Sequence, residues 1–424
     1  MITTQKIDVI MFNMSTFFDW DRGVVNRNYF ILNELAKSDK INRLIGADFL
    51  PNTIRRAIPH YVKNIFFEPK TSEMVYGDLT SACYARTNKI YIYSTIDSVF
   101  SYKTVARELL RIERVLNLKN IVFWSYNPMF TEFIGKLNEK LFIFDTVDNW
   151  TEHAAYLKLM SKRKLIKNYQ AIAEKADLIF TVSRELKDFY RELGRTRDVH
   201  WIPNGVDYAH FNEPEKIEKA NPLAKISGPI IGYLGTIECR VDFDLIAKIA
   251  SAHRDKTIAL CGPVWPSIKH ELKQKLSKYK NIILTGRVKY DDIPSYINRF
   301  DVAIIPHKIN EFIKSTNPMK MYDYLACGKP IVTTRGAGVD MFADYVYATN
   351  DPNKFVKFID DAINTDSAEK QNQRREIVRS HSWQARVNEM TRFVVEKLSM
   401  HRSNEYRKIE AKNQKEEKNL ILNF

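Results

Sequence analysis

The sequence predicts an α/β protein with two doubly wound domains, and three observations lead to this prediction. Short, continuously apolar runs alternate with segments of helical periodicity along the whole chain. These runs are too apolar to have one wet face, which is typical of parallel strands covered on both sides. The alternation breaks once, after HWIPNGVD (200–207), and then starts again. At 424 residues, the chain is long enough for two domains of about 200 residues each.

The first domain is predicted to span 1–205. Its first strand is IDVIMFN (7–13), followed by a helix from Val24 to Lys37. Further helices are expected at 103–117 and 162–176. The other expected strands are 43–49, 90–94, 121–127, 141–147 and 178–182.

The second domain is predicted to span 206–380. A helix at 382–398 follows it, with no strand after the helix. The tail at 401–424 is highly charged, so we expect it to be partly disordered or helical. The expected strands of this domain are 229–235, 257–262, 281–286, 301–306 and 330–334.

Charge and cysteine content narrow the possible partners. Lys and Arg outnumber Asp and Glu by 65 to 51, a formal net charge of +14. This excess suits anionic partners, and an ordinary solvated basic surface explains it equally well. Four scattered cysteines, without CxxC spacing or a His/Cys cluster, predict a reducing cytosol and no zinc site. Neither a signal peptide nor a membrane span is expected.

The segment KSTNPMKMYDYLACGKP (314–330) follows an expected strand at the carboxyl end of the second sheet. Doubly wound folds bind ligands at this end. We predict a short helix at about 318–327, with Asn317 as its N-cap and Gly328 just past its end.

The start of this helix is a candidate diphosphate site. The amides of Ser315, Thr316 and Asn317 are expected to be unpaired and to converge there. Lys320 would add a positive charge, and Asp323 could accept hydrogen bonds from a ribose diol. The alternative is a solvated Lys/Asp pair on an ordinary amphipathic helix.

The same segment resembles the donor-site signature of GT-B glycosyltransferases, especially those that build bacterial exopolysaccharides and teichuronic acid. In that signature, STNPxKxxEYLAxGKPVV, Asp323 replaces the usual glutamate. The resemblance implies the GT-B fold, with two Rossmann-like domains facing across a cleft, and a nucleotide-sugar donor, favouring UDP. The matching residues are Ser315, Thr316, Asn317, Pro318, Lys320, Tyr324, Leu325, Gly328 and Pro330.

Other segments extend the resemblance over most of the chain. IPNGVD (202–207) is similar to the family's interdomain junction, and GYLGTIECRVDFDLI (232–246) to the first unit of its donor domain. The final helix, within 381–400, would cross back to the N-terminal domain. The resemblance assigns donor contacts to Gly235, Thr236, Arg240, Gly262, Gly286 and Val288. Tyr290 either stacks on the base or is structural.

The acceptor is expected at the N-terminal side of the cleft. The loop STFFDWDRGVVNRN (15–28) joins the first strand to the first helix. We expect acceptor contacts from this loop and from the end of a later strand, at Trp20, Asp21, Gly23, Arg27 and Ser183. Gly23 either permits a close backbone approach or serves the turn.

Asp148 is the predicted catalytic base, with Lys320 as the second catalytic residue. Asp148 follows the expected strand at 141–147, where a carboxylate can deprotonate an acceptor hydroxyl. Its alternative role is to cap the next loop. Asp145 is a rival inside the strand, and His153 is a weaker candidate.

Ser315 stands where many retaining relatives carry the first of two glutamates, so an inverting reaction is favoured. We expect no bound metal. A peripheral membrane contact is expected at LKLMSKRKLIKN (157–168), which has five basic residues and no acidic one. A solvated basic face is the alternative.

Three other functions stay open. The first is a nucleotide-sugar 2-epimerase of the same fold, and the second is a non-catalytic scaffold that binds a nucleotide. Nucleic-acid binding is the weakest, because no aromatic-basic stripe supports it.

Overall fold

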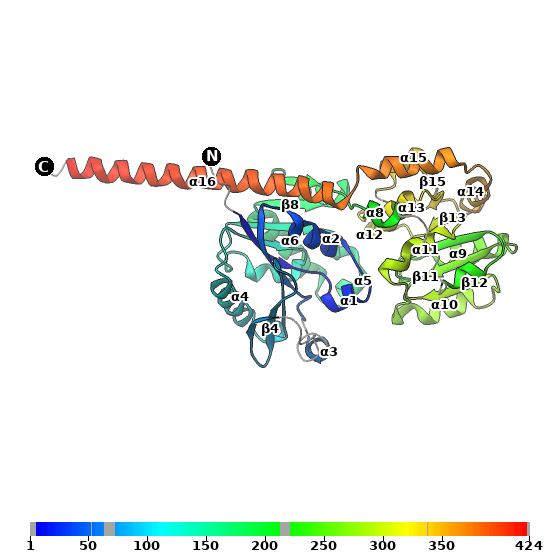
Figure 1. Cartoon of the computed structure of the whole chain (residues 1–424), viewed down its shortest axis with the longest axis horizontal. Coiled ribbons are helices and arrows are strands. Elements are labelled where there is room, and N and C mark those ends of the chain that lie inside the picture. Colours follow the sequence, from blue (N-terminus) through cyan, green and yellow to red (C-terminus); the bar gives the residue numbers. More distant parts are fainter. Residues whose placement is uncertain (1–5, 52, 63–72, 213–220, 337, 422–424) are drawn as a thin grey trace.

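The chain forms two α/β domains, each with its own parallel-stranded sheet (Figure 1). The computed structural model describes residues 6–51, 53–62, 73–212, 221–336 and 338–421. Within these residues, no helix is long and apolar enough to cross a lipid bilayer. The last three residues of the predicted tail, 422–424, lie outside the described part of the chain.

The N-terminal sheet has nine strands in the order β3-β4-β5-β2-β1-β6-β7-β8-β9. All neighbours pair in parallel except β3–β4 and β4–β5, which are antiparallel. The strands are β1 (Ile7–Phe12), β2 (Ile41–Ala47), β3 (Met74–Gly77), β4 (Ser81–Ala85), β5 (Ile90–Thr95), β6 (Ile121–Ser125), β7 (Leu141–Thr146), β8 (Leu178–Thr181) and β9 (Val199–Trp201).

Helices cover both faces of this sheet, as the continuously apolar strands predict. Val9 and Met11 of β1 belong to one hydrophobic core, and Ile10 and Phe12 belong to the other. Successive strand residues point to opposite faces, so both faces of β1 are buried. The helices of this domain are α1 (Phe17–Asp21), α2 (Arg27–Lys37), α3 (Ile54–His60), α4 (Tyr102–Leu116), α5 (Ala154–Leu157), α6 (Lys162–Lys175) and α7 (Arg184–Glu192).

The C-terminal sheet has six parallel strands in the order β12-β11-β10-β13-β14-β15. Its strands are β10 (Ile230–Leu234), β11 (Thr257–Cys261), β12 (Ile282–Gly286), β13 (Val302–Ile305), β14 (Ile331–Thr333) and β15 (Tyr347–Ala348). Its helices are α8 (Tyr208–Asn212), α9 (Phe243–Ala252), α10 (Lys269–Leu276), α11 (Ile293–Asn298), α12 (Glu311–Lys314), α13 (Met319–Ala326), α14 (Pro352–Asn364) and α15 (Ala368–Arg379). The predicted GT-B arrangement, two doubly wound domains facing each other, is therefore confirmed.

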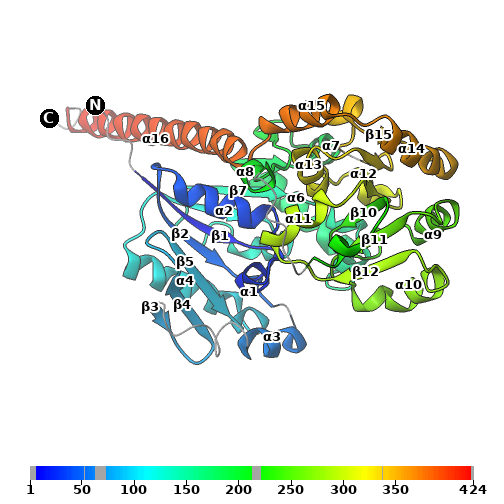
Figure 2. The ribbon, with the colours of Figure 1, turned by 45° about the vertical axis from the view of Figure 1, so that its right-hand side comes forward.

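The last helix, α16 (Trp383–Ile421), returns from the C-terminal domain to the N-terminal domain (Figure 2). Trp383 stacks on Phe30 of α2, with ring centroids 4.9 Å apart. Val387, Met390 and Val394 are buried in the same N-terminal core. The helix is much longer than the expected 382–398, because it runs on through most of the charged tail.

Candidate active site

A cleft of about 350 Å³ lies between the two domains. Its N-terminal wall comes from the α1–α2 connection and the loop after β7. Its C-terminal wall comes from the carboxyl ends of β10, β11 and β13 and the start of α13. The predicted site residues that line this cleft are Gly23, Asp148, Gly235, Thr236, Arg240, Gly262, Val288, Thr316, Asn317, Lys320 and Asp323.

Lys320 is the central cation of the C-terminal wall. Its Nζ donates to the hydroxyl of Tyr233 at 3.0 Å and lies 3.5 Å from Nε2 of His307. Burial, and to a lesser extent nearby Arg240, lower the pKa of Lys320 to about 7. Gly235 makes room for this side chain, since a Cβ at Gly235 would lie 3.0 Å from Cε of Lys320. A bound anion would restore the full charge of the ammonium group.

Arg240 lies beside Lys320 and forms an ion pair with Glu238. The Glu238 side chain is only 4% exposed, and its Oε2 atom has no hydrogen-bond partner. The pair therefore leaves part of the hydrogen-bonding capacity of both groups unused, because Nε of Arg240 is also unpaired. Lys320 and Arg240 thus lie on one wall together with the buried carboxylate of Glu238.

Asp148 faces these groups from the N-terminal wall. Burial raises the pKa of Asp148 to about 7, an effect that Arg240 partly offsets. A carboxyl group that titrates near neutral pH is suited to general-base chemistry. By contrast, Asp145 lies inside β7, is fully buried and pairs with Arg27 at 3.0 Å. The rival base is therefore part of the core.

The start of α13 differs from the prediction. The amide of Ser315 donates to the carbonyl of Phe312, and that of Thr316 donates to the carbonyl of Ile313. These two amides therefore close α12 and are not free for a phosphate, which corrects the predicted roles of Ser315 and Thr316. The N-cap is Pro318, without a side-chain cap, so the first-turn amides of Met319 and Lys320 lack an intrahelical acceptor.

Asn317 does not cap the helix either. Its Oδ1 accepts from the amide of Asn204 and from the hydroxyl of Tyr322, both at 2.9 Å. Its carbonyl accepts from Nδ2 of Asn204 at 2.6 Å. Asn317 therefore joins the helix start to the interdomain connection, which explains why this loop is fixed beside the cleft.

Asp323 lies one turn further along α13 and lines the cleft. Burial raises the pKa of Asp323 to about 8, although Lys320 opposes this change. Gly286, predicted as a donor contact, ends β12 outside the cleft lining. Tyr290 lines the cleft, and its ring stacks on His210 with centroids 4.4 Å apart. This contact is of the kind expected if Tyr290 has a structural role.

Three of the predicted acceptor residues have structural positions instead. Trp20 is 4% exposed and packs against Phe17. Asp21 forms an ion pair with Arg86 outside the cleft lining. Arg27 is buried, and besides Asp145 it donates to the carbonyl of Pro203 and to Oδ1 of Asn204.

Gly23, in contrast, lines the cleft at a close contact between the domains. Its φ of +81° favours glycine, and an added Cβ would lie 2.7 Å from the amide nitrogen of Tyr290. Both alternatives for Gly23, turn and close approach, therefore have a structural basis.

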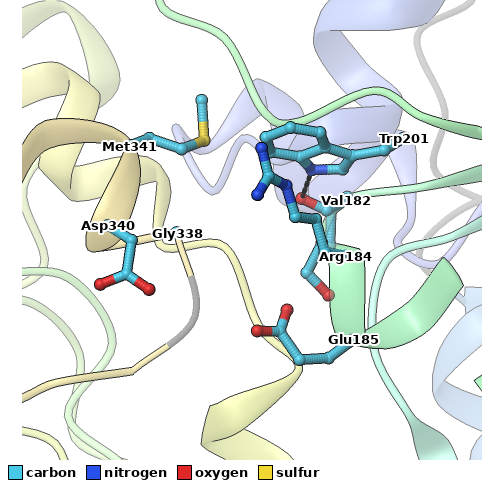
Figure 3. Close-up of a pocket in the computed structure, with 8 residues that line it drawn as sticks. Val182, Arg184, Glu185, Trp201, Gly338, Asp340 and Met341 are labelled. Atoms are coloured by element: carbon cyan, nitrogen blue, oxygen red, sulfur yellow. Dashed lines mark hydrogen bonds between the residues drawn. The ribbon is translucent and has the colours of Figure 1, made fainter. Parts of the chain in front are cut away.

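A second, smaller pocket of about 130 Å³ lies between the domains behind the 315–317 loop (Figure 3). Trp201, Arg184 and Glu185 contribute from one domain, and Asp340 and Met341 from the other. The predicted acceptor residue Ser183 lines this pocket. However, its hydroxyl donates to the carbonyl of Ser315 at 2.7 Å and caps α7.

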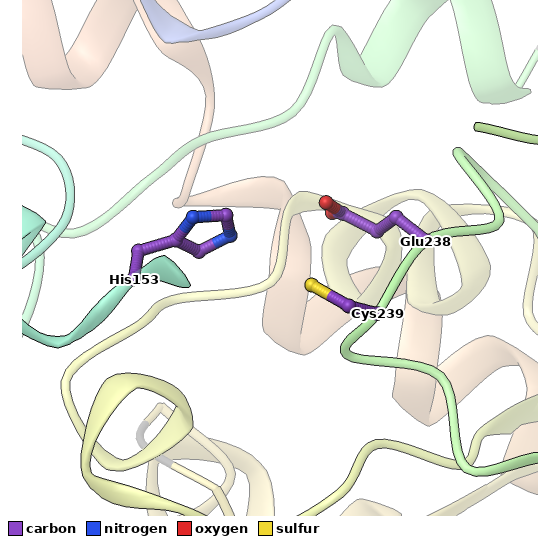
Figure 4. A group of neighbouring side chains, drawn as sticks. All are labelled: His153, Glu238 and Cys239. Atoms are coloured by element: carbon purple, nitrogen blue, oxygen red, sulfur yellow. The ribbon is translucent and has the colours of Figure 1, made fainter. Parts of the chain in front are cut away.

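His153, Glu238 and Cys239 form a side-chain group whose possible metal-ligand atoms lie within 4.8 Å of one another (Figure 4). Burial lowers the pKa of His153, so the ring is neutral at pH 7. Its Nδ1 accepts from the amide of Ala155 at 3.2 Å, so the proton is on Nε2. A protonated Nε2 is a hydrogen-bond donor and not a metal ligand in this arrangement.

Sequence reasoning missed Glu238, His307 and Asn204. His307 directly follows β13, so its position at a carboxyl strand end was a usable signal. Glu238 is next to no apolar run that would mark it, and Asn204 belongs to the segment 202–207, for which the sequence predicts only the junction between the domains. Both take their positions from tertiary contacts.

Residues 228–365 match a protein-family model described as Glycosyl transferases group 1. The glycosyltransferase TuaH of Bacillus subtilis (strain 168), whose name assigns it to teichuronic acid biosynthesis, is 27% identical over 263 residues. That alignment covers 59% of this chain and 66% of the relative, just under two thirds of its length.

Solved structures share the fold over nearly the whole chain. Sucrose-phosphate synthase from Thermosynechococcus elongatus matches with a TM-score of 0.70 and 12% identity, covering 93% of this chain and 100% of its own. Anabaena HepE, solved with UDP and glucose, has a TM-score of 0.64 and 10% identity, covering 91% of this chain and 99% of its own. An S. aureus TarM variant, solved with UDP, matches with a TM-score of 0.57 and 11% identity, covering 92% of this chain and 99% of its own.

The fold and the interdomain cleft define a GT-B protein. Its C-terminal domain, over residues 228–365, is similar to the group 1 glycosyltransferases.

Proposed function

We propose that this protein transfers a sugar from a nucleotide-sugar donor, preferably a UDP-sugar, to a saccharide or lipid-linked acceptor in the synthesis of a cell-surface glycan. One observation carries the proposal. A carboxyl group that titrates near pH 7, Asp148, faces two cations, Arg240 and Lys320, within one cleft between two domains.

The cationic wall would bind the donor diphosphate. Lys320, Arg240 and the first-turn amides of α13 lie on this wall and would stabilise the negative charge that develops on the leaving nucleotide. These groups supply positive charge from the protein itself, so we propose that no resident metal ion takes part. Asp323 would accept hydrogen bonds from the ribose hydroxyls.

Asp148 would act as the base on the opposite wall. It would take the proton from an acceptor hydroxyl, whose oxygen then attacks the anomeric carbon as the nucleotide diphosphate leaves. This direct displacement inverts the configuration at that carbon. Ser315 supports the choice, because its buried hydroxyl is bonded to the carbonyl of Phe312 and offers no carboxylate to the sugar.

The structural neighbours support the donor class. HepE was solved with UDP and glucose, and the TarM variant with UDP and alpha-GlcNAc-glycerol, among other ligands. The four free cysteines agree with a cytoplasmic location, where thiols stay reduced.

A thermal-shift screen against UDP-, GDP-, CDP- and ADP-sugars tests the donor assignment. A ligand at about 100 times its Kd stabilises the folded protein by roughly 2.7 kcal/mol, so the strongest shift names the nucleotide. We expect a shift with UDP-sugars that disappears in Lys320→Ala. Equal shifts in both proteins would contradict the assigned phosphate site.

Product analysis then separates transfer from the alternatives. A glycosyltransferase releases UDP and yields a glycosylated acceptor, whereas a 2-epimerase returns an intact donor with one inverted centre. A scaffold would bind UDP-sugar and leave it unchanged. The configuration of the new linkage, compared with that of the donor, tests inversion.

A further inference from the structure

Helix α3 presents apolar side chains to solvent. Ile54 is 59% exposed and Ile58 is 62% exposed, and they share one helix face because they are four residues apart. Val62, just after the helix, is also exposed. A face of this kind is typical of an interaction surface.

Two further exposed apolar residues lie near this helix. Leu79 is at the β3–β4 turn, and Phe100 precedes α4. Thr80 beside Leu79 donates to Asp97 at 3.0 Å, and Ser98 donates to the carbonyl of Pro51 at 2.5 Å. These bonds join the three segments at the carboxyl end of the sheet. In both whole-chain views, α3 and the β3–β4 turn lie at the lower end of this domain (Figures 1 and 2).

The charge around these residues favours an anionic partner. Arg55, Arg56 and Lys103 are exposed, and the sequence from 49 to 62 contains no acidic residue. Asp78, next to Leu79 in the β3–β4 turn, is exposed, and it accepts hydrogen bonds from Tyr76 and from backbone amides. These hydrogen bonds outweigh burial and lower the pKa of Asp78, so its carboxylate stays charged. Its negative charge is, however, already stabilised by hydrogen-bond donors of the protein.

The segment predicted from sequence to contact a membrane, 157–168, differs from this surface. Leu165 is fully buried, and Leu159 and Met160 pack against the core. Its basic side chains are exposed, and Leu157, at 37%, is its one large apolar side chain counted as exposed. A single electrostatic signal gives weak attachment, whereas basic and apolar groups together give stable attachment.

We propose that the α3 edge, defined as Ile54, Arg55, Arg56, Ile58, Leu79 and Phe100, docks on an anionic lipid bilayer. The apolar side chains would enter the headgroup region while the arginines contact lipid phosphates. The carboxyl ends of parallel strands meet at one edge, so this surface lies on the same side of the sheet as Asp148. A lipid-linked molecule in the bilayer would then be near the N-terminal wall of the cleft.

Co-sedimentation of the full chain with vesicles tests this inference. Vesicles of phosphatidylcholine alone are compared with vesicles of phosphatidylcholine and phosphatidylglycerol in equal parts. We expect binding to the anionic vesicles only, weakened by salt. Arg55→Gln/Arg56→Gln should reduce the binding constant by roughly fivefold per lost charge, and Ile54→Ser/Ile58→Ser should reduce it further.

Val115→Ser is the matched control, because Val115 is 63% exposed at the far end of α4. It should bind like the wild type. Failure of the wild type to bind either vesicle, or equal binding by all variants, would overturn the proposal. Thermal shifts with UDP-sugar, measured without vesicles, report on the donor site independently, so the two proposals fail separately.

Discussion

The two walls of the cleft differ in what they offer a substrate. The C-terminal wall presents Arg240, Lys320 and a helix start, all of which attract an anion. The N-terminal wall presents Asp148, which can accept a proton. In the proposed reaction, the C-terminal domain would stabilise the leaving group and the N-terminal domain would activate the acceptor.

The walls differ equally in how their polar residues are used. On the C-terminal side, the predicted residues Thr236, Arg240 and Lys320 line the cleft. On the N-terminal side, Arg27 and Trp20 are buried in structural contacts. Arg27 on the N-terminal side is therefore expected to act on stability, whereas Lys320 on the C-terminal side is proposed to act on binding, and each role predicts a different mutant phenotype.

The largest expected effect is on catalysis by Asp148. Asp148→Asn removes the base but keeps the shape of the side chain, so the transfer rate should fall by about 10²–10⁴-fold. UDP release in the presence of acceptor measures this rate. UDP-sugar binding should persist, because the phosphate groups contact the other wall. A variant with the wild-type rate would remove Asp148 from the mechanism.

The next effect concerns stability in the N-terminal domain. Arg27→Ala leaves Asp145 buried without its partner, which should cost about 3–5 kcal/mol. Urea unfolding measures the loss. Arg86→Ala is the control, because its pair with Asp21 is substantially exposed and such pairs contribute about 0–1 kcal/mol. Similar losses in both variants would contradict a structural role specific to Arg27.

A substitution of Lys320 should weaken donor binding without lowering stability, in contrast to Arg27→Ala. Lys320→Met removes a charge-assisted contact with the donor, so UDP-sugar affinity should fall by roughly 10–100-fold. The free variant should be as stable as the wild type or more stable, because a lysine whose pKa falls from 10.5 to about 7 on folding destabilises the protein wherever the unfolded chain holds the proton, most strongly below pH 7. The gain should vanish towards pH 10. Calorimetry with and without donor separates the two effects.

The fold could be predicted because its central strands are apolar on both faces. Runs such as 257–262 and 301–306 therefore overlap β11 and β13 closely. The β3–β4 hairpin was missed because MVYG and SACYA contain no long apolar run, and β5 sets their pairing. Likewise, the last helix was expected to end at 398, with a partly disordered or helical tail at 401–424, whereas α16 is one continuous helix of 39 residues.

The site could be predicted only where local sequence determines it. Lys320 and Asp323 lie on one short, well-bounded helix. The amides of Ser315 and Thr316 were misassigned because α12, a helix of only four residues, was not recognised and its end uses them. Arg27 and Asp145 are 118 residues apart, so their pairing depends on tertiary structure that local spacing does not encode.

The smallest expected effect is the pH dependence of the two walls. Asp148 must be deprotonated to act, so the rate should fall as the pH drops below about 7. Lys320 must be protonated to attract phosphate, so donor affinity should fall by about fivefold from pH 7 to pH 8 if the bound lysine keeps its proton. Titrations of UDP-sugar binding and rate at fixed ionic strength measure the two limbs separately. Lys320→Met should abolish the alkaline change in affinity and leave the acid limb of the rate intact. An alkaline change that persists in this variant would assign it to another group on the C-terminal wall.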